Sequence, residues 1–410
     1  MQTGYMRKNM PFLYELGKKT NLHAMNSVYP TVSSVAWSSF ATGVNPAEHG
    51  IFGFTDRHPE PFEIYVPTSK DRKKTPIWNK LPKELRVNVI NVPLTYPPEP
   101  VNGKMISCFL CSDIKKAAYP KYFGDYLENM GYIIDVDSWI ARKDMELFIN
   151  QLILALQKRF ELTFELLKED WNYFQLHIME TDRLLHFAIE YLLPPLTGTY
   201  SPLVQLFFNT LDNFIFQLYE KIIASAAIII LSDHGFCKIL YEVELNVWLQ
   251  QQGFLCFKEQ EKRLANYSPD TTCYALTPGR IYLNLAGREQ NGSILPKDYE
   301  RVREEVKKAL LGINNPITKE PVIEKVMYRE ELYQGKYLLQ APDLILHPHN
   351  GYDLKSSLDG NTVFSSSALK GMHTYEDAVI LGDHIEVSEV SEISEVYNIV
   401  QKYMSIWPGA

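Results

Sequence analysis

The chain has 410 residues, of which 46% are hydrophobic and 22% are charged. This composition is typical of soluble globular proteins, and it excludes a collagen-like, coiled-coil or disordered chain. The chain carries 41 Lys and Arg against 49 Asp and Glu, a formal charge of −8, so we expect neither a nucleic acid nor an anionic membrane as its partner.

The sequence also bears on location. It contains no run of about 18 apolar residues, the length that a membrane helix needs. Residues 1–10 include two basic side chains but are not followed by the apolar segment of a signal peptide. Five cysteines are few for this length and odd in number, which predicts a reducing compartment. We therefore expect a cytoplasmic protein.

Short apolar runs alternate with longer amphipathic stretches along the chain. Strands are predicted at Val87–Val92, Tyr173–Ile178 and Ala226–Leu231, and long helices at Met145–Lys168 and Ser201–Ala224. Continuous apolar strands of this length are typical of a parallel sheet that is covered on both faces. The pattern therefore predicts an α/β fold: a doubly wound, mostly parallel sheet with helices on both faces.

The pattern of apolar and charged residues changes between residues 261 and 339. Two predicted strands flank a charged amphipathic helix at Lys297–Leu311, and Ala341–Leu346 returns to the apolar texture of the core. We therefore predict a small α+β insertion, a cap-like subdomain, at 261–339, within an α/β core formed by 1–260 and 340–410.

Side chains that bind metals follow the predicted strands. Asp233 and His234 come directly after the third strand, while Asp182 and His186 follow the second strand with the i, i+4 spacing that points both to one centre. His373 lies in a Gly-containing loop near the end of the chain. Because ligands bind at the carboxyl ends of parallel strands, these five groups are expected to gather there. Carboxylate and imidazole ligands without thiolate suit Zn²⁺, Mn²⁺ or Fe.

A further helix is predicted from the segment that ends at Gly43. Ser33 or Ser34 would stand at its N-terminus, where plain N-capping is one reading. The other reading uses the free N–H groups and the positive end of the helix dipole, which bind a phosphoryl group. A metal ion nearby would then turn the serine hydroxyl into a nucleophile.

Together these motifs resemble the alkaline phosphatase superfamily. Within it, they resemble the type I phosphodiesterase/nucleotide pyrophosphatase-like phosphohydrolases, in their phosphohydrolase/phosphomutase branch. The resemblance covers about residues 10–385, and its four motifs occur in the family's order. They are Ser33–Phe54, Met179–His186, Leu231–Phe236 and Lys370–His373. The resemblance implies an alkaline phosphatase-like fold and two divalent metal ions, with zinc as the expected metal and manganese or iron as alternatives.

The same resemblance assigns roles to individual residues. It implies one metal held by Asp182, His186 and His373, and a second metal held by Asp233 and His234. Ser33 is implied as the nucleophile, and Ser34 takes that role if the register slips by one.

Two positions depart from the family pattern. In the family, a first strand ends in an Asp that also binds the second metal, whereas the first Asp of this chain is Asp56, after the nucleophile segment. Three readings stay open: the chain starts late, the second metal is weak, or Asp56 substitutes. Phe54 stands where nucleotide-cleaving relatives carry an Asn that contacts the phosphoryl group. His49, which also belongs to the family motif, is expected to have a buried structural role.

The implied function is a metal-dependent phosphoric ester hydrolase, a phosphodiesterase or phosphomonoesterase, that acts on a small phosphate ester through a phosphoserine. Two alternatives remain: a phosphomutase or phosphotransferase of the same superfamily, and a non-catalytic ligand-binding homologue, because the N-terminal Asp is absent. A sulfatase is disfavoured because Ser33–Trp37 lacks the Pro and Arg of the sulfatase motif. The sequence leaves formation of a homo-oligomer open.

Overall fold

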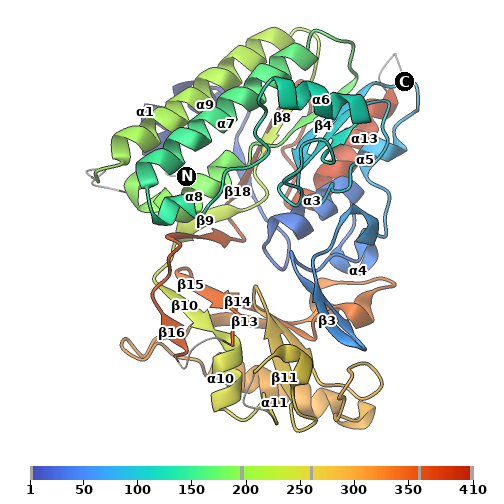
Figure 1. The fold of residues 1–410 in the computed structure, drawn as a ribbon, viewed down its shortest axis with the longest axis vertical. Helices are drawn as coiled ribbons and strands as arrows, with labels where there is room; N and C mark the ends of the chain where they lie inside the picture. Colours follow the sequence, from blue (N-terminus) through green and yellow to red (C-terminus); the bar gives the residue numbers. More distant parts are fainter. Residues whose placement is uncertain (1–2, 194–197, 259–261, 359–361, 407–410) are drawn as a thin grey trace.

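The computed structural model describes residues 3–193, 198–258, 262–358 and 362–406. The chain forms a larger lobe, in which long helices pack around a sheet, and a smaller lobe built mainly of strands (Figure 1). In the part of the chain that is described, no helix has the length and apolar character to cross a membrane.

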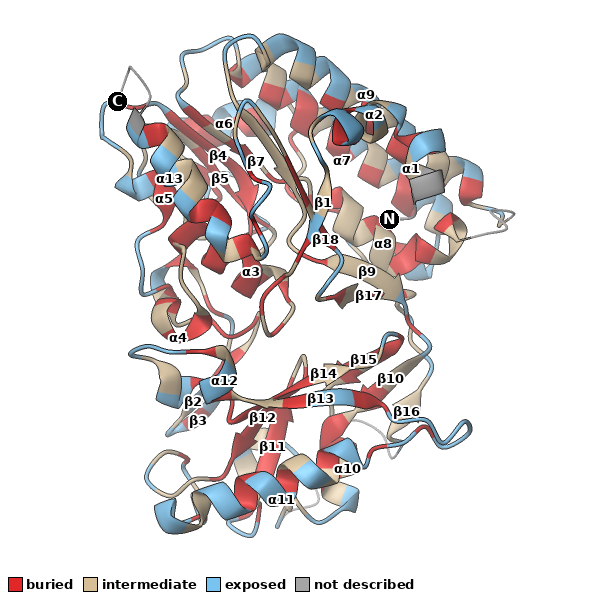
Figure 2. Cartoon of the chain, turned by 180° about the vertical axis from the view of Figure 1, so that it is seen from behind, coloured by how far each residue is buried: buried red, intermediate tan, exposed pale blue. Residues whose placement is uncertain are grey.

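The larger lobe is built around β4 (Val87–Val92), whose six residues are all buried (Figure 2). β4 pairs in parallel with β5 (Gly103–Ser107) on one edge and with β7 (Tyr173–Leu176) on the other. A short strand, β6 (Ala118–Tyr119), runs antiparallel to β5. These ladders confirm the predicted parallel pairing and the α/β class.

The strand that precedes Asp233 differs from β4. Among the described residues, β8 (Ile228–Leu231) pairs only with β18 (Ala378–Asp383), which is antiparallel to it and also pairs with β1 (His23–Met25). The sequence predicts burial of this apolar strand on both faces, and this prediction is wrong, because all four residues are only half-buried. With one edge unpaired among the described residues, the strand lacks the neighbour that would cover its side chains.

Helices cover the sheet on both faces. α7 (Met145–Leu166) and α9 (Ser201–Ile222), which match the predicted long helices, pack with α8 (Glu180–Ala188) into one apolar cluster that also contacts Leu176 of β7. α3 (Ser33–Thr42) and α13 (Val396–Ile406) belong to another cluster, which includes Tyr173 of the same strand. Side chains an odd number of residues apart on a strand point to opposite faces, so the two clusters lie on the two sides of the sheet.

The smaller lobe has two sheets. The first contains β11 (Cys273–Leu276), β12 (Arg280–Leu283), β14 (Leu344–Pro348) and β13 (Ile323–Tyr328), in that order and antiparallel throughout. α10 (Leu245–Gln251) and α11 (Tyr299–Leu311) share its apolar cluster. In the second sheet, β10 (Tyr241–Glu244) lies between β15 (Tyr352–Lys355) and β16 (Phe364–Ser365).

This pairing bears on the predicted insertion. The expectation that Ala341–Leu346 returns to the core is wrong, because β14 hydrogen-bonds to β12 and β13 of the smaller lobe. The other predicted boundary, between residues 260 and 261, falls outside the described residues.

Besides its 3₁₀ turns, the chain has further helices and strands, all of them short. Two strands form the pair that carries His373, β9 (Gly235–Lys238) and β17 (Gly371–Thr374). The others are α1 (Thr3–Asn9), α2 (Pro11–Lys19), α4 (Pro46–His49), β2 (Asp56–Pro59), β3 (Phe62–Tyr65), α5 (Ile77–Lys80), α6 (Lys121–Asn129) and α12 (Arg329–Leu332).

Candidate active site

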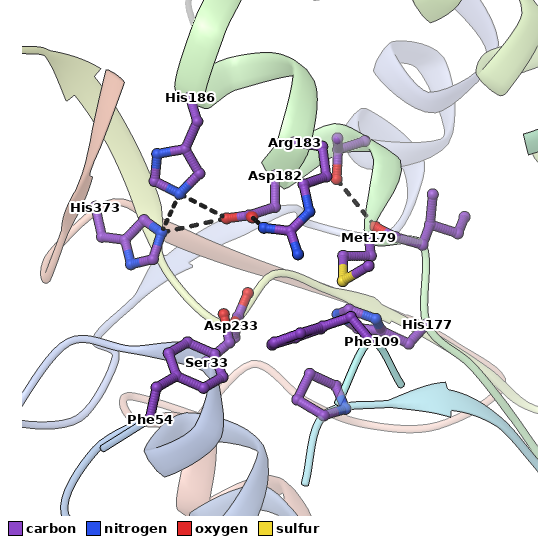
Figure 3. A pocket seen from close by; sticks show the side chains of 13 residues that line it. Ser33, Phe54, Phe109, His177, Met179, Asp182, Arg183, His186, Asp233 and His373 are labelled. Atoms are coloured by element: carbon purple, nitrogen blue, oxygen red, sulfur yellow. Dashed lines mark hydrogen bonds and ion pairs between the residues drawn. The ribbon is translucent and has the colours of Figure 1, made fainter. Parts of the chain in front are cut away.

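Residues from four distant segments line one cavity of about 190 Å³ (Figure 3). Ser33 is the first residue of α3, and Asp182 and His186 lie one turn apart on α8. Asp233 follows β8, and His373 lies on β17. Val32 is extended, so α3 begins at Ser33. N–H groups of the first turn are left without helical partners, as at any helix N-terminus.

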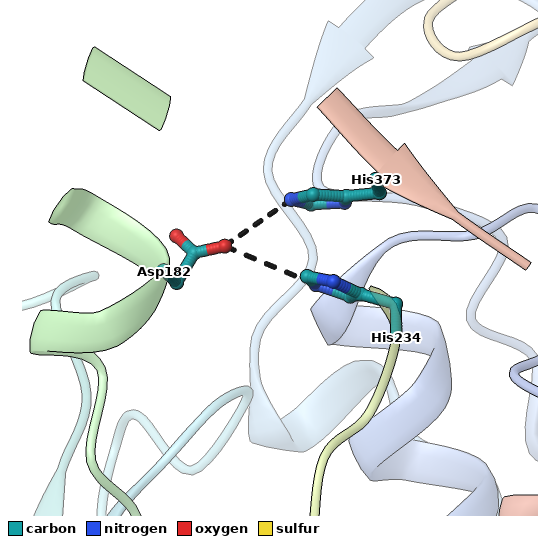
Figure 4. A group of neighbouring side chains, drawn as sticks. All are labelled: Asp182, His234 and His373. Carbon is teal, nitrogen blue, oxygen red and sulfur yellow. Dashed lines mark hydrogen bonds and ion pairs between the residues drawn. The ribbon is translucent and has the colours of Figure 1, made fainter. Parts of the chain in front are cut away.

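Three imidazoles surround one carboxylate oxygen. Oδ1 of Asp182 lies 3.2 Å from Nε2 of His373 and 3.9 Å from Nε2 of His234 (Figure 4), and 3.5 Å from Nε2 of His186 (Figure 3). The Nε2 atoms of His186 and His373 are 3.1 Å apart, and the rings of His234 and His373 stack with centroids 3.5 Å apart. Four potential ligand atoms therefore converge on a small volume.

The other nitrogen of each imidazole fixes this orientation. In all three rings Nδ1 contacts a backbone carbonyl oxygen, which can only accept, so Nδ1 carries a proton, and in the neutral form of each ring Nε2 presents a lone pair to the cluster. The carbonyl partners are Gly371 for His186 at 2.9 Å, Gly235 for His234 at 3.2 Å and Thr31 for His373 at 3.2 Å.

The pKa values follow from burial and from the crowding of these groups. Burial alone raises the pKa of Asp182, but attraction by His186, His373 and His234 outweighs it and holds the pKa well below its usual range. Burial lowers the pKa of His186 to about 4 and also lowers that of His234. For His373 burial, which lowers the pKa, is outweighed by the hydrogen bond to Asp182, so its pKa is raised: this ring holds a second proton, on Nε2, more readily than a free imidazole does. An ionised carboxylate beside neutral imidazoles is the state that binds a metal cation.

Ser33 rather than Ser34 faces this cluster. The Oγ of Ser33 lies 3.1 Å from Nε2 of His234 and lines the cavity, while Ser34 is fully buried and its Oγ has no hydrogen-bond partner among the described residues. Asp233 lies on the same side, with Oδ2 buried, 3.3 Å from Nε2 of His234 and without a hydrogen bond in the described part of the chain. Such a buried, unsatisfied carboxylate oxygen fits a cation ligand.

The five predicted metal ligands are thus brought together, but as one continuous cluster. His234, assigned by resemblance to the second metal, stacks on His373 of the first set, and the group whose ligand atoms all lie within 4.8 Å of one another is Asp182, His234 and His373. The donor set of carboxylate and imidazole fits Zn²⁺, Mn²⁺ or Fe. The division of the cluster into two metal sites stays a prediction.

Asp56 does not join the cluster. Its carboxylate is buried at the start of β2, where Oδ1 lies 3.9 Å from Nη1 of Arg280 and accepts a hydrogen bond from the backbone N–H of Arg57. The suggestion that Asp56 replaces the N-terminal Asp is therefore wrong, because its side chain does not line the cavity.

His49 has the structural role expected for it. The ring is fully buried, and its Nδ1 accepts the backbone N–H of Ile51 at 3.1 Å, so the protonated Nε2 donates to Oγ of Ser39 at 3.0 Å. These bonds tie the turn after α4 to the buried side of α3.

Sequence reasoning gave no site role to several residues that line the cavity, among them Arg183 and Phe109. Arg183 directly follows the ligand Asp182 in the motif, and that adjacency was a signal for it. Phe109 follows β5 and carried no signal, because the fold alone brings that loop against α8.

The fold is alkaline phosphatase-like, as the similarity to solved structures shows. The family described as type I phosphodiesterase / nucleotide pyrophosphatase matches residues 1–376, and the chain belongs to this family. Among curated proteins, none matches the sequence.

Several solved structures share the fold at low sequence identity. Phosphonoacetate hydrolase from Sinorhizobium meliloti 1021, solved with phosphonoacetate, is 15% identical with a TM-score of 0.63, over 98% of this chain and 92% of that one. Murine ectonucleotide pyrophosphatase/phosphodiesterase 5 is 14% identical with a TM-score of 0.55, over 99% and 93%. The alkaline phosphatase PafA is 13% identical with a TM-score of 0.59, over 99% and 94%.

Proposed function

We propose that this chain is a metal-dependent phosphohydrolase that cleaves small phosphate esters through a covalent phosphoserine at Ser33. The observation that carries the proposal is the position of the Ser33 hydroxyl, 3.1 Å from Nε2 of His234, at the edge of the cluster in which Asp182 meets three imidazoles. Membership of the type I phosphodiesterase/nucleotide pyrophosphatase family supports ester cleavage at phosphorus.

Divalent metal ions, for which we propose zinc, would be held by Asp182, His186 and His373 and by Asp233 and His234. When bound, such ions supply Lewis acidity toward phosphoryl oxygens and lower the pKa of water. The chain itself orients the ligands, because each imidazole is tied to a backbone carbonyl through Nδ1. It also orders the nucleophile, because Ser33 lies at the first turn of a helix rather than in a loop.

The reaction would take two displacements at phosphorus. In the first, Oγ of Ser33 bonds to phosphorus, loses its proton to solvent, and the organic group leaves with the ester oxygen, which takes up a proton. In the second, water attacks phosphorus and loses a proton to solvent, the bond to Oγ breaks, and Oγ takes up a proton, which restores the serine hydroxyl. The N-terminus of α3 favours the negative charge of the phosphoryl group in both steps.

The test uses zinc-loaded protein and two chromogenic esters, p-nitrophenyl phosphate and bis(p-nitrophenyl) phosphate. We expect release of p-nitrophenol and, after acid quenching, a chain heavier by one phosphoryl group from the monoester or by one p-nitrophenylphosphoryl group from the diester. Ser33→Ala should lose both, with a fall in rate of at least about 10³-fold. Ser34→Ala is the matched control, because its buried hydroxyl does not face the cavity, and it should keep both.

Three results would contradict the proposal in different ways. An unchanged rate in Ser33→Ala would remove the phosphoserine, and loss only in Ser34→Ala would shift the nucleophile by one residue. Metal-loaded wild-type protein that cleaves neither ester would favour the non-catalytic alternative. A new phosphate ester formed when glycerol is present would instead support phosphotransfer.

The compartment is a separate proposal. The structure contains five free cysteines, three of them buried. Unpaired thiols are typical of reducing compartments, so we propose the cytoplasm as the location.

A further inference from the structure

Arg183 is a positively charged side chain aimed at the cluster from the cavity wall. Among the described residues that line the cavity, it is the single guanidinium or ammonium group. Its Nε and Nη2 donate to the two carboxylate oxygens of Asp135, at 3.1 and 2.8 Å. This bidentate pairing sets the plane of the guanidinium group.

The third nitrogen of Arg183 is directed elsewhere. Nη1 lies 4.0 Å from Oδ2 of Asp182, beyond hydrogen-bond distance, so its N–H groups remain available at the border of the cluster (Figure 3). Ser33 and Arg183 line the same cavity of about 190 Å³, so both side chains border the space in which a phosphate ester would be bound. Arginine N–H groups make charge-assisted bonds to phosphoryl oxygens.

Aromatic rings continue the wall beyond the guanidinium group. Cζ of Arg183 lies 5.0 Å from the centroid of the Phe109 ring, which is within the range of a cation–π contact. Phe54 meets Phe109 edge to face, with centroids 5.3 Å apart. Both rings line the cavity and are half-buried, so each keeps some surface open to a bound molecule. The wall of the cavity is therefore charged at Arg183 and aromatic at the neighbouring Phe109 and Phe54.

We propose that Arg183 is a substrate-binding residue, whose Nη1 donates to a non-bridging phosphoryl oxygen, and that the Phe54–Phe109 pair binds a flat apolar group next to phosphorus. Asp135 is a positioning residue that acts through Arg183. The inference rests on the proposed function, because it assumes that the phosphoryl group is bound beside Ser33. It names the substrate class as phosphate esters with an aromatic or other flat apolar substituent.

The test measures binding rather than turnover. Phenylphosphonate and methylphosphonate have the same charged group but differ in the apolar part, and their P–C bond leaves no ester to cleave. We would measure both dissociation constants by calorimetry on zinc-loaded Ser33→Ala protein. Phenylphosphonate should bind about 10-fold more tightly or better, because only the phenyl group can pack on the aromatic pair.

Variants then separate the two parts of the site. Arg183→Ala should weaken both ligands about equally, by roughly 10- to 100-fold, which is the range for a lost charge-assisted hydrogen bond. Phe109→Ala should remove most of the preference for phenylphosphonate and weaken methylphosphonate less. Asp135→Asn should weaken both ligands by less than Arg183→Ala, and Arg183→Lys should restore part of the loss.

Controls exclude indirect effects. Arg142→Ala removes an exposed arginine that pairs with Trp139 outside the cavity, and it should leave both dissociation constants unchanged. Metal per chain is measured for every variant, so that loss of zinc is not counted as loss of binding. Unchanged binding in Arg183→Ala with full metal content, or an unchanged phenyl preference in Phe109→Ala, would overturn the inference. A failed phosphoserine reaction appears separately, as absence of the adduct in wild-type protein.

Discussion

Two carboxylates on helix α8, Glu180 and Asp182, stand two residues apart in opposite surroundings. Glu180 is almost fully buried and accepts hydrogen bonds from Arg159, whose guanidinium also donates to the hydroxyl of Tyr132 and the carbonyl of Ile134. Its charge is therefore matched by a permanent cation within the fold.

Within the residues that the structure describes, Asp182 has no permanent cation at hydrogen-bond distance; the guanidinium of Arg183 lies 4.0 Å away and is hydrogen-bonded to Asp135. The Asp182 side chain keeps 22% of its surface exposed, and its nearest neighbours are imidazoles whose Nδ1 protons point away to backbone carbonyls. The lone pairs that remain face the same space as the carboxylate. The comparison teaches that a charge neutralised inside the fold serves stability, whereas a charge left among neutral donors is prepared for a cation.

The largest effect is expected from breaking the first arrangement. Arg159→Ala leaves Glu180 buried without its cation, so the free energy of unfolding should fall by about 3–5 kcal/mol. Urea unfolding of the metal-free protein measures it. Lys158→Ala, which removes the neighbouring surface pair with Glu161, should cost less than about 1 kcal/mol. Equal losses in both variants would show that the buried pair contributes no more to the free energy of unfolding than the surface pair does.

A change at Asp182 should affect metal binding instead of folding. Asp182→Asn keeps the shape of the side chain but removes its charge, so zinc affinity should fall by at least about 100-fold. The free energy of unfolding of the metal-free protein should fall much less than in Arg159→Ala. Competition with a chromophoric chelator gives the affinity, and Glu190→Gln, beyond the end of α8, is the control. Full zinc affinity in Asp182→Asn would disprove the ligand assignment.

The smallest effect concerns a buried group with no charge partner. Burial lowers the pKa of His49 to about 3, below the 6.5 of a free imidazole. Below pH 6.5 the unfolded chain therefore binds more protons than the folded chain does. The contribution of the neutral His49 to the free energy of unfolding is fully present above that pH and is lost as the pH falls toward 3. At pH 5 the loss from this residue is about 2 kcal/mol.

The change in unfolding free energy between pH 7.5 and pH 5 measures this contribution. His49→Gln cannot ionise, so its own stability should depend less steeply on pH by about that amount. His384→Gln, which removes an exposed imidazole, controls for the loss of a histidine elsewhere in the chain. An identical slope in wild type and His49→Gln would show that His49 is not the group responsible.

Local patterns in the sequence determined several elements of the fold and most of the site. The apolar run of β4 and the amphipathic periods of α7 and α9 agree with the structure to within a few residues, because they depend on neighbours along the chain. The five candidate ligands were found for the same reason: most of them directly follow a strand or share one helical turn.

Contacts between distant segments were decided only by the tertiary structure. β8 is as apolar as β4 but only half-buried, because burial depends on which strands flank it. β14 joined the smaller lobe through hydrogen bonds to β12 and β13. Arg183 meets Asp135 and Phe109 across separations of 48 and 74 residues, and no local pattern records such a pairing. The local sequence thus determined which helices, strands and candidate ligands the chain contains, and tertiary packing decided which of them are in contact.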